Sequence, residues 1–194
     1  MSTPTIVDKT DLLESLLAER ILVLDGAMGT QIQALGYDER AVRGQRFAAH
    51  HKDLKNFADI LCLTHPDAIE QIHRRYYAAG ADVVETNTFG ASPLGMEEFG
   101  LPLALVREIN HEAVALACRA RDEFNAKTPD RPRFVAGSIG PTTKQTAIST
   151  KVDDASYRGV TFDQMADSYY AQVAALVEAG VDVLIPETVI DSLN

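Results

Sequence analysis

The sequence predicts an α/β protein with a parallel sheet, assembled from about four consecutive strand and helix units. Short apolar runs alternate with amphipathic stretches along the 194 residues, which is typical of parallel sheets covered by helices. Two related strings, AAGADVVET at 78–86 and EAGVDVLIPET at 178–188, each run from a helix end through Asp into an apolar strand that ends in Glu-Thr. Such recurrence indicates stacked βα units joined by right-handed crossovers.

The first unit opens with a helix over 11–20. A leucine stripe and a capping-box pattern, Asp11 with Glu14, support this helix. It leads directly into an apolar strand, ILVL at 21–24. Residues 31–63 show no clear periodicity, and we interpret them as an excursion over the end of that strand.

Three further units complete the series. A helix begins at Pro66 and stops at Gly80, and a strand follows at 81–85. The remaining elements are a long helix from Pro102 to the polar turn at 128–133, a strand at 134–141, a helix capped by Thr161 and Gln164 and ended by Gly180, and a strand at 181–188. Pro186 removes one ladder N–H from the last strand and predicts a distorted strand end.

Two architectures share this alternation, a TIM barrel and a doubly wound sheet. Neither G-x-G-x-x-G nor a P-loop follows the first strand, whereas polar residues end every strand, at the position of barrel active sites. We therefore expect a (βα)8 barrel. Since eight units take about 250 residues, we expect a half barrel from a longer protein, truncated at the C-terminus. Residues 1–18 form its N-terminal extension and leading helix, and 19–194 the N-terminal half of the barrel domain.

The composition argues for a small-molecule ligand. A net charge of -10 disfavours binding to nucleic acid or to an anionic membrane, because both need a basic face. No stretch reads as a signal peptide or reaches the length of a membrane span, so we expect a cytoplasmic protein. Cys62 and Cys118 lie far apart in the sequence and form no C-x-x-C pattern. We therefore expect both to be reduced thiols and not partners in a disulfide.

Three acids are the strongest candidate site residues. Asp25, Glu85 and Glu187 each end a different predicted strand, so a barrel brings them to one mouth. Asn87 and the backbone of 137–140 lie at the same end. Carboxylates held together in a partly dry pocket repel each other and attract a cation, either a metal or a substrate ammonium group. The simpler alternative is that each acid caps a helix or pairs with a nearby base.

The loop GAMGT at 26–30 provides the complementary half of the pocket. Its glycines let exposed N–H groups converge on an anion such as a carboxylate. A cation site beside an anion site indicates a pocket for an amino acid. A metal site is not indicated, because no H-x-x-x-H or H-E-x-x-H spacing occurs among the histidines, which are His50, His51, His65, His73 and His111.

Several separated strings carry a resemblance to a known family. They are RILVLDGAMGTQIQ, VRGQRF, AGADVVETNTF, FVAGSIGPTTKQTAIS, GVTFDQMADSYYAQVAALVEAGVDVL and ETVIDSLN. In order and spacing, from about residue 19 to 194, they resemble the N-terminal homocysteine-binding domain of cobalamin-dependent methionine synthase.

The resemblance implies a methyltransferase whose barrel holds homocysteine at its mouth. The substrate thiolate is bound to zinc and attacks the methyl group of methylcobalamin, which a further domain of the same polypeptide carries and a folate domain remethylates. It also implies that the amino-acid end of homocysteine is held by Asp25, Gly26, Ala27, Met28, Glu85, Asn87, Ser138 and Glu187. The three zinc-ligand cysteines are expected beyond Asn194, so this piece alone is expected to be inactive and to bind neither metal nor cobalamin.

Two alternatives remain open. One is a cobalamin-independent homocysteine S-methyltransferase, which uses a betaine or sulfonium donor on the same barrel. The other is a non-catalytic half-barrel binding module that self-associates, because its first and fourth strands leave apolar edges exposed.

Overall fold

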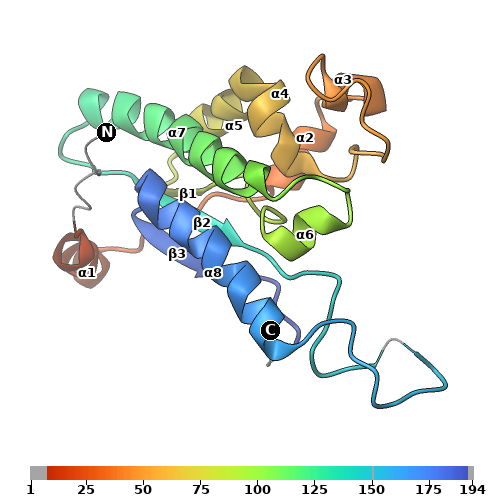
Figure 1. Ribbon diagram of the computed structural model, residues 1–194. Coiled ribbons are helices and arrows are strands. Elements are labelled where there is room, and N and C mark those ends of the chain that lie inside the picture. The colour runs from red at the N-terminus through yellow and green to blue at the C-terminus, as the bar shows by residue number, and fades with distance from the viewer. Residues whose placement is uncertain (1–7, 150, 192–194) are drawn as a thin grey trace.

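The structure is a computed structural model that describes residues 8–149 and 151–191. Its strands are parallel and in sequential order, as predicted, but the sheet has three strands instead of the expected four (Figure 1). These are β1 (Val83–Glu85), β2 (Phe134–Ile139) and β3 (Val183–Pro186). In the register, Val84 lies opposite Val135, and Gly137 opposite Leu184. Sequential parallel strands in an open sheet are the arrangement that the first units of a barrel produce.

The first predicted strand, at 21–24, is shorter than expected. Only one bridge forms, between Leu24 and Val83 of β1. The segment nevertheless runs parallel to β1, because Asp25 N–H donates to the Val83 carbonyl at 2.9 Å and Asp82 N–H donates to the Val23 carbonyl at 2.7 Å. Among the described residues it has a neighbour on one side only, which explains why its pairing stays incomplete.

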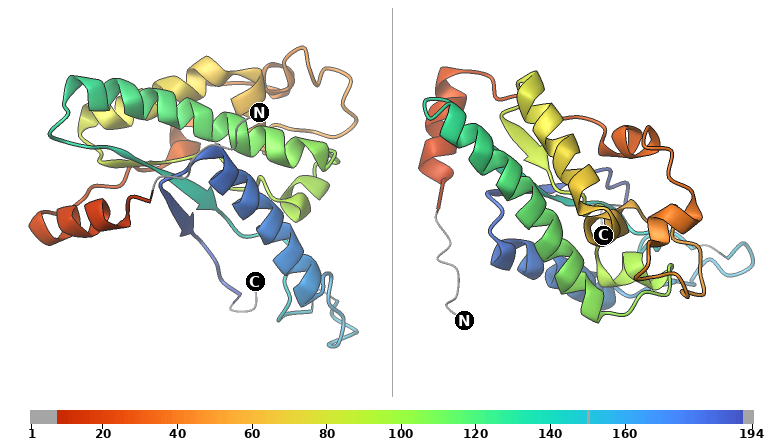
Figure 2. Two further views of the ribbon diagram at one scale, coloured as in Figure 1. Left: turned by 60° about the vertical axis from the view of Figure 1, so that its left-hand side comes forward. Right: turned by 90° about the horizontal axis from the view of Figure 1, so that it is seen from above.

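Three long helices lie on one face of the sheet, as both views in Figure 2 show. They are α5 (Pro66–Ala79), α7 (Ala104–Lys127) and α8 (Phe162–Ala179). Gly80 ends α5 with φ 109°, a left-handed conformation that glycine adopts without strain. Thr161 and Gln164 form the predicted capping box of α8. These helices confirm the predicted βα units.

The segment interpreted as an excursion is partly helical and well packed, so that prediction was wrong in part. It contains α2 (Met28–Gln33), α3 (Glu39–Arg43), a 3-10 turn η1 (Ala58–Ile60) and α4 (Leu61–Thr64). Leu54, Phe57 and Ile60 are buried in the largest apolar cluster. A further short helix, α6 (Pro93–Glu97), is capped by Ser92 and was not predicted. Helices this short give no periodic signal, and tertiary contacts determine them.

The helix α1 (Thr10–Glu19) lies apart from the others, at the red end of the chain in Figure 1. It has no buried residue, and its predicted stripe includes Leu17, which is 61% exposed. The predicted capping box is absent, because the N-cap is Lys9 and Asp8 accepts the N–H of Thr10 instead. None of the helices within 8–149 and 151–191 has the length and hydropathy needed to cross a bilayer.

Pro186 is accommodated as the last residue of β3. The N–H of Glu187 donates to the Ile139 carbonyl at 3.0 Å. Because alternate residues of a strand face opposite neighbours, the missing N–H of Pro186 falls on the open edge. The predicted distortion appears two residues later, where Thr188 has φ 57°.

The Asp of each repeated string fastens the amino end of a strand. Asp82 has a side chain that is 1% exposed. It accepts hydrogen bonds from Arg20 at 2.9 Å, from the Val23 N–H at 3.0 Å and from Arg131 at 2.9 Å. Burial alone would raise the pKa of Asp82, but these three donors outweigh it and lower the pKa to about 2.

Asp182 repeats this arrangement one hundred residues further along the sequence. Its carboxylate accepts the Val135 N–H at 2.8 Å and hydrogen bonds from Lys9 and Arg121 at 2.5 and 3.0 Å. The recurrence seen in the sequence is therefore a recurrence of structure. In both copies, the Asp that opens one strand binds the backbone of the strand before it.

We expect Asp82→Ala to destabilise the fold by about 3 kcal/mol at pH 7, since it leaves two guanidinium groups without their buried partner. A lowered folded pKa adds stability above the unfolded value of about 4. The contribution of Asp82 should therefore disappear as the pH falls from about 4 to about 2. Urea unfolding at several pH values measures both effects. Asp53→Ala is the control, because the Asp53 side chain is 91% exposed, and equal losses for the two variants would contradict the role of Asp82.

Candidate functional site

A pocket of about 440 Å³ lies at the carboxyl ends of the strands. Its lining includes every residue of the predicted site, namely Asp25, Gly26, Ala27, Met28, Glu85, Asn87, Ser138 and Glu187. Asp25 follows the bridge to β1, Glu85 closes β1, Ser138 lies in β2 and Glu187 follows β3. The geometry thus brings the predicted residues together, although it does not by itself assign their roles.

The three predicted acids meet within this pocket. Asp25 Oδ1 accepts the backbone N–H of Glu85 at 3.1 Å, while its second oxygen, Oδ2, is buried without a partner among the described residues. Ser138 Oγ donates to Glu187 at 2.5 Å. Since no Lys, Arg or His is among the described residues that line the pocket, its negative charge is not balanced by basic side chains of the wall.

The electrostatics of the cluster follow from this composition. The pKa of Asp25 is raised to about 7, chiefly by burial and also by the neighbouring carboxylates of Glu85 and Glu187, although the bond from the Glu85 N–H opposes the shift. Burial, together with Glu187, also raises the pKa of Glu85. The free pocket therefore retains a proton near neutral pH, and a cationic ligand would favour its release.

The GAMGT loop lines the pocket and continues into α2. Gly26 and Gly29 both have ordinary φ values, and a Cβ atom at Gly29 would meet nothing within 4 Å. A Cβ at Gly26 would approach only Tyr76, at 3.8 Å. The described fold does not require glycine at either position, which leaves the backbone here open to a ligand.

The opposite wall was missed by sequence reasoning. It includes Asn56, Ala58, Asp59 and Phe89. Asp59 is buried, and burial raises its pKa to about 7 although the Gly90 N–H donates to it. An acid within the apolar run FADILCL was the available signal, but the sequence analysis treats this segment only as an irregular excursion over the end of the first strand.

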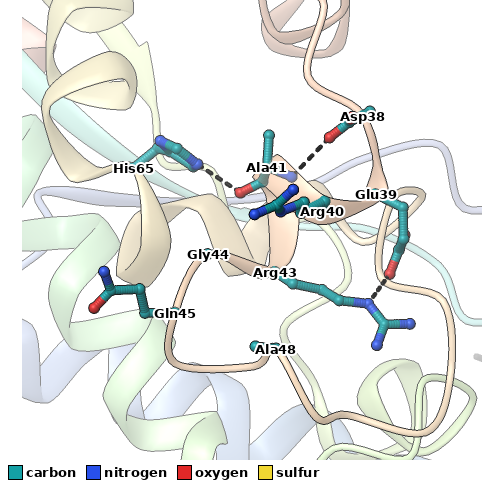
Figure 3. Close-up of a pocket in the computed structure, with 9 residues that line it drawn as sticks. All are labelled: Asp38, Glu39, Arg40, Ala41, Arg43, Gly44, Gln45, Ala48 and His65. Atoms are coloured by element: carbon teal, nitrogen blue, oxygen red, sulfur yellow. Dashed lines mark hydrogen bonds and ion pairs between the residues drawn. The ribbon is translucent and has the colours of Figure 1, made fainter.

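A larger hollow of about 1010 Å³, shown in Figure 3, lies elsewhere. It is formed around the VRGQRF string, and its polar groups bind each other. Arg43 donates to Glu39 and to the carbonyl of Lys52, and His65 Nε2 donates to the Ala41 carbonyl at 2.7 Å. These bonds hold the segment 38–53 in place. They account for the polar residues around this hollow, so no ligand is needed to explain them.

The described residues do not offer a metal site. No group of three or more His, Cys, Asp or Glu side chains within 8–149 and 151–191 could hold a metal ion. Cys62 is buried and Cys118 is partly buried, and neither forms a disulfide. Zinc therefore does not fit the residues that the structure describes.

Comparisons with known proteins agree with the predicted architecture. Three crystal structures of the homocysteine methyltransferase MmuM from Escherichia coli are similar to this chain. The metallated form has a TM-score of 0.70 at 28% identity and covers 93% of this chain and 58% of its own. The oxidized form has a TM-score of 0.69 at 26% identity, and the match covers 92% of this chain and 57% of the MmuM chain. The apo form has a TM-score of 0.60 at 26% identity, and the match covers 89% of this chain and 51% of the MmuM chain.

The chain thus spans little more than half the length of these methyltransferases, and its fold is a partial TIM barrel, as predicted. The sequence model of the homocysteine S-methyltransferase family matches residues 22–194. Since this match covers most of the chain, the chain belongs to the homocysteine S-methyltransferase family.

Proposed function

We propose that the acidic pocket binds the amino-acid end of homocysteine, and that the whole protein methylates the thiol to make methionine. The observation that carries this proposal is the cluster of Asp25, Glu85 and Glu187 without a basic side chain among the pocket lining. An ammonium group would supply the missing charge and donate three hydrogen bonds to oxygens that otherwise repel each other.

Each predicted residue has a defined part in this proposal. Asp25 Oδ2 is a buried acceptor without a partner among the described residues, so it is the first candidate for the ammonium group. Glu187 is oriented by Ser138 Oγ and closes the same end of the pocket. The backbone of Gly26 to Met28 faces the substrate carboxylate. These residues bind and orient the substrate, and the proton displaced from Asp25 leaves to solvent.

The methyl donor is a separate part of the proposal. We favour methylcobalamin, with folate and cobalamin domains in the same polypeptide, because VRGQRF and the stretch from Gly140 to Phe162 resemble the cobalamin-dependent enzymes. Zinc would supply a thiolate at neutral pH, but through residues outside 8–149 and 151–191. A betaine or sulfonium donor is the alternative, and assaying the whole protein with each donor distinguishes them. We place the barrel part at residues 19–194.

We expect homocysteine to bind weakly to the chain in isothermal calorimetry, without dependence on added zinc. Asp25→Asn should weaken binding about 10- to 100-fold, because a charge-assisted hydrogen bond contributes about 1.5–3 kcal/mol. Asp130→Asn, an exposed acid in a distant turn, should leave the affinity unchanged. Equal affinities for the Asp25 variant and the unmodified chain would contradict the assignment of Asp25.

The same cluster should make the free chain less stable as the pH rises. Asp25 has a folded pKa of about 7, above the unfolded value of about 4, so the folded state binds more protons between these values and loses stability with rising pH. We expect Asp25→Asn to remove this loss and to increase the free energy of unfolding at pH 8, by at most about 4 kcal/mol. Urea unfolding at pH 5 and pH 8 measures the difference. Parallel pH curves for variant and unmodified chain would show that Asp25 titrates normally.

A further inference from the structure

We propose that Asp59 is a positioning residue, which holds the loop after β1 so that Asn87 presents only its carbonyl oxygen to the pocket. The proposal rests on the proposed function in one respect, namely that Asn87 faces the substrate. Nothing in the sequence pattern assigned a role to Asp59. The contacts between two segments, 58–62 and 86–90, carry the argument.

The first contact fixes the far end of the loop. Asp59 is 5% exposed, and its Oδ1 accepts the N–H of Gly90 at 2.8 Å. The packing is close on the same side, since a Cβ atom at Gly90 would lie 3.3 Å from the ring of Phe57 and 3.6 Å from Asp59 Oδ2. The carboxylate of Asp59 therefore holds Gly90 in place, and the close packing leaves little room for the loop to shift.

Two more contacts fix the near end of the loop. Asn87 Nδ2 donates to the Ala58 carbonyl at 2.9 Å and to Cys62 Sγ at 3.6 Å. In return, Cys62 Sγ donates to the backbone carbonyl of Asn87 at 3.6 Å. We call the contacts of Ala58, Asp59 and Cys62 with Asn87 and Gly90 the clasp. Both anchors of the loop thus come from one short stretch of chain.

The clasp determines which way the Asn87 amide faces. A backbone carbonyl can only accept a hydrogen bond, so the nitrogen of the amide must face Ala58. The side chain has one polar atom left, the carbonyl oxygen, and Asn87 is 5% exposed where it lines the pocket. Asn87 is thereby fixed as an acceptor.

This orientation has a consequence for specificity. With Asn87 as an acceptor, the pocket end that contains Asp25, Glu85 and Glu187 offers acceptors and lacks a basic side chain. Such a site favours a ligand with several N–H donors. A ligand without these donors would leave the acceptors of the site unpaired, and that costs binding free energy. The clasp therefore contributes to selecting an amino acid over the corresponding sulfanyl carboxylate, which lacks the amino group.

The test uses the full chain with two substitutions at one position. D59A removes the acceptor for the Gly90 N–H, whereas D59N keeps an acceptor oxygen of the same size and removes the charge. S92A is the matched control, because Ser92 is also buried, lies outside the pocket lining and accepts one backbone N–H, that of Gly95 in α6. Thermal unfolding of each variant establishes the temperature at which all are folded.

Two readouts separate positioning from simple destabilisation. Hydrogen exchange of the Asn87 side-chain amide, followed by NMR without ligand, reports the clasp directly. The ratio of affinities for homocysteine and for 4-sulfanylbutanoate, which lacks the amino group, reports specificity. We expect D59A to speed the amide exchange about tenfold and to lower the affinity ratio about tenfold. For D59N, both quantities should stay within about threefold of the values for the unmodified chain. S92A should change neither.

Unchanged exchange and an unchanged ratio in folded D59A would overturn the proposal, as would D59N behaving like D59A. If D59A does not fold, C62A replaces it, because it removes both sulfur contacts to Asn87 without leaving a buried charge, and unchanged exchange in C62A would overturn the proposal equally. If the unmodified chain binds no homocysteine, the proposed function fails, while the exchange measurement still decides the role of Asp59.

Discussion

Parallel pairing of the strands is the constraint on which the rest of the molecule depends. Because all strands run in one direction, their amino ends meet at one end of the sheet and their carboxyl ends at the other. Asp82 and Asp182 immediately precede β1 and β3, whereas Glu85 and Glu187 stand at their far ends. A single register therefore sorts the acids of the repeated strings into two groups, and the order of residues along each string decides which group each acid joins.

The parts of the fold that the sequence predicts well are those with local signals. Pro66 and Gly80 mark both ends of α5, and the pair Thr161 and Gln164 marks the start of α8, so these helices needed no knowledge of their neighbours. The pocket residues were predictable for a related reason. Each lies at the end of an apolar run, and parallel pairing then brings the ends of such runs together.

The parts that could not be predicted depend on partners distant in sequence. The segment 21–24 forms only one bridge instead of a full strand. Strand pairing depends on neighbouring strands, and the strand propensity of the segment itself does not reveal which neighbours it has. Leu54 and Phe57 carry no periodic signal, yet they are buried in one apolar cluster with residues of α4 and α7 that are distant in sequence. Asp59 is the clearest case. Its acceptor role depends on the Gly90 N–H, thirty-one positions away, and no local pattern indicates that an acid in an apolar run has such a donor.

The two groups of acids differ in how their charge affects the stability of the fold. At the amino end, Asp82 is buried among basic donors, and its pKa is lowered to about 2, so its charge stabilises the fold. At the carboxyl end, burial and like charges raise the pKa of Asp25 to about 7, so its charge opposes the fold. Asp82 has basic partners, whereas the described residues that line the pocket of Asp25 include none. A cluster that costs stability is explained most simply when a ligand supplies the partner, and an ammonium group, as proposed above, has the charge that the pocket lining lacks.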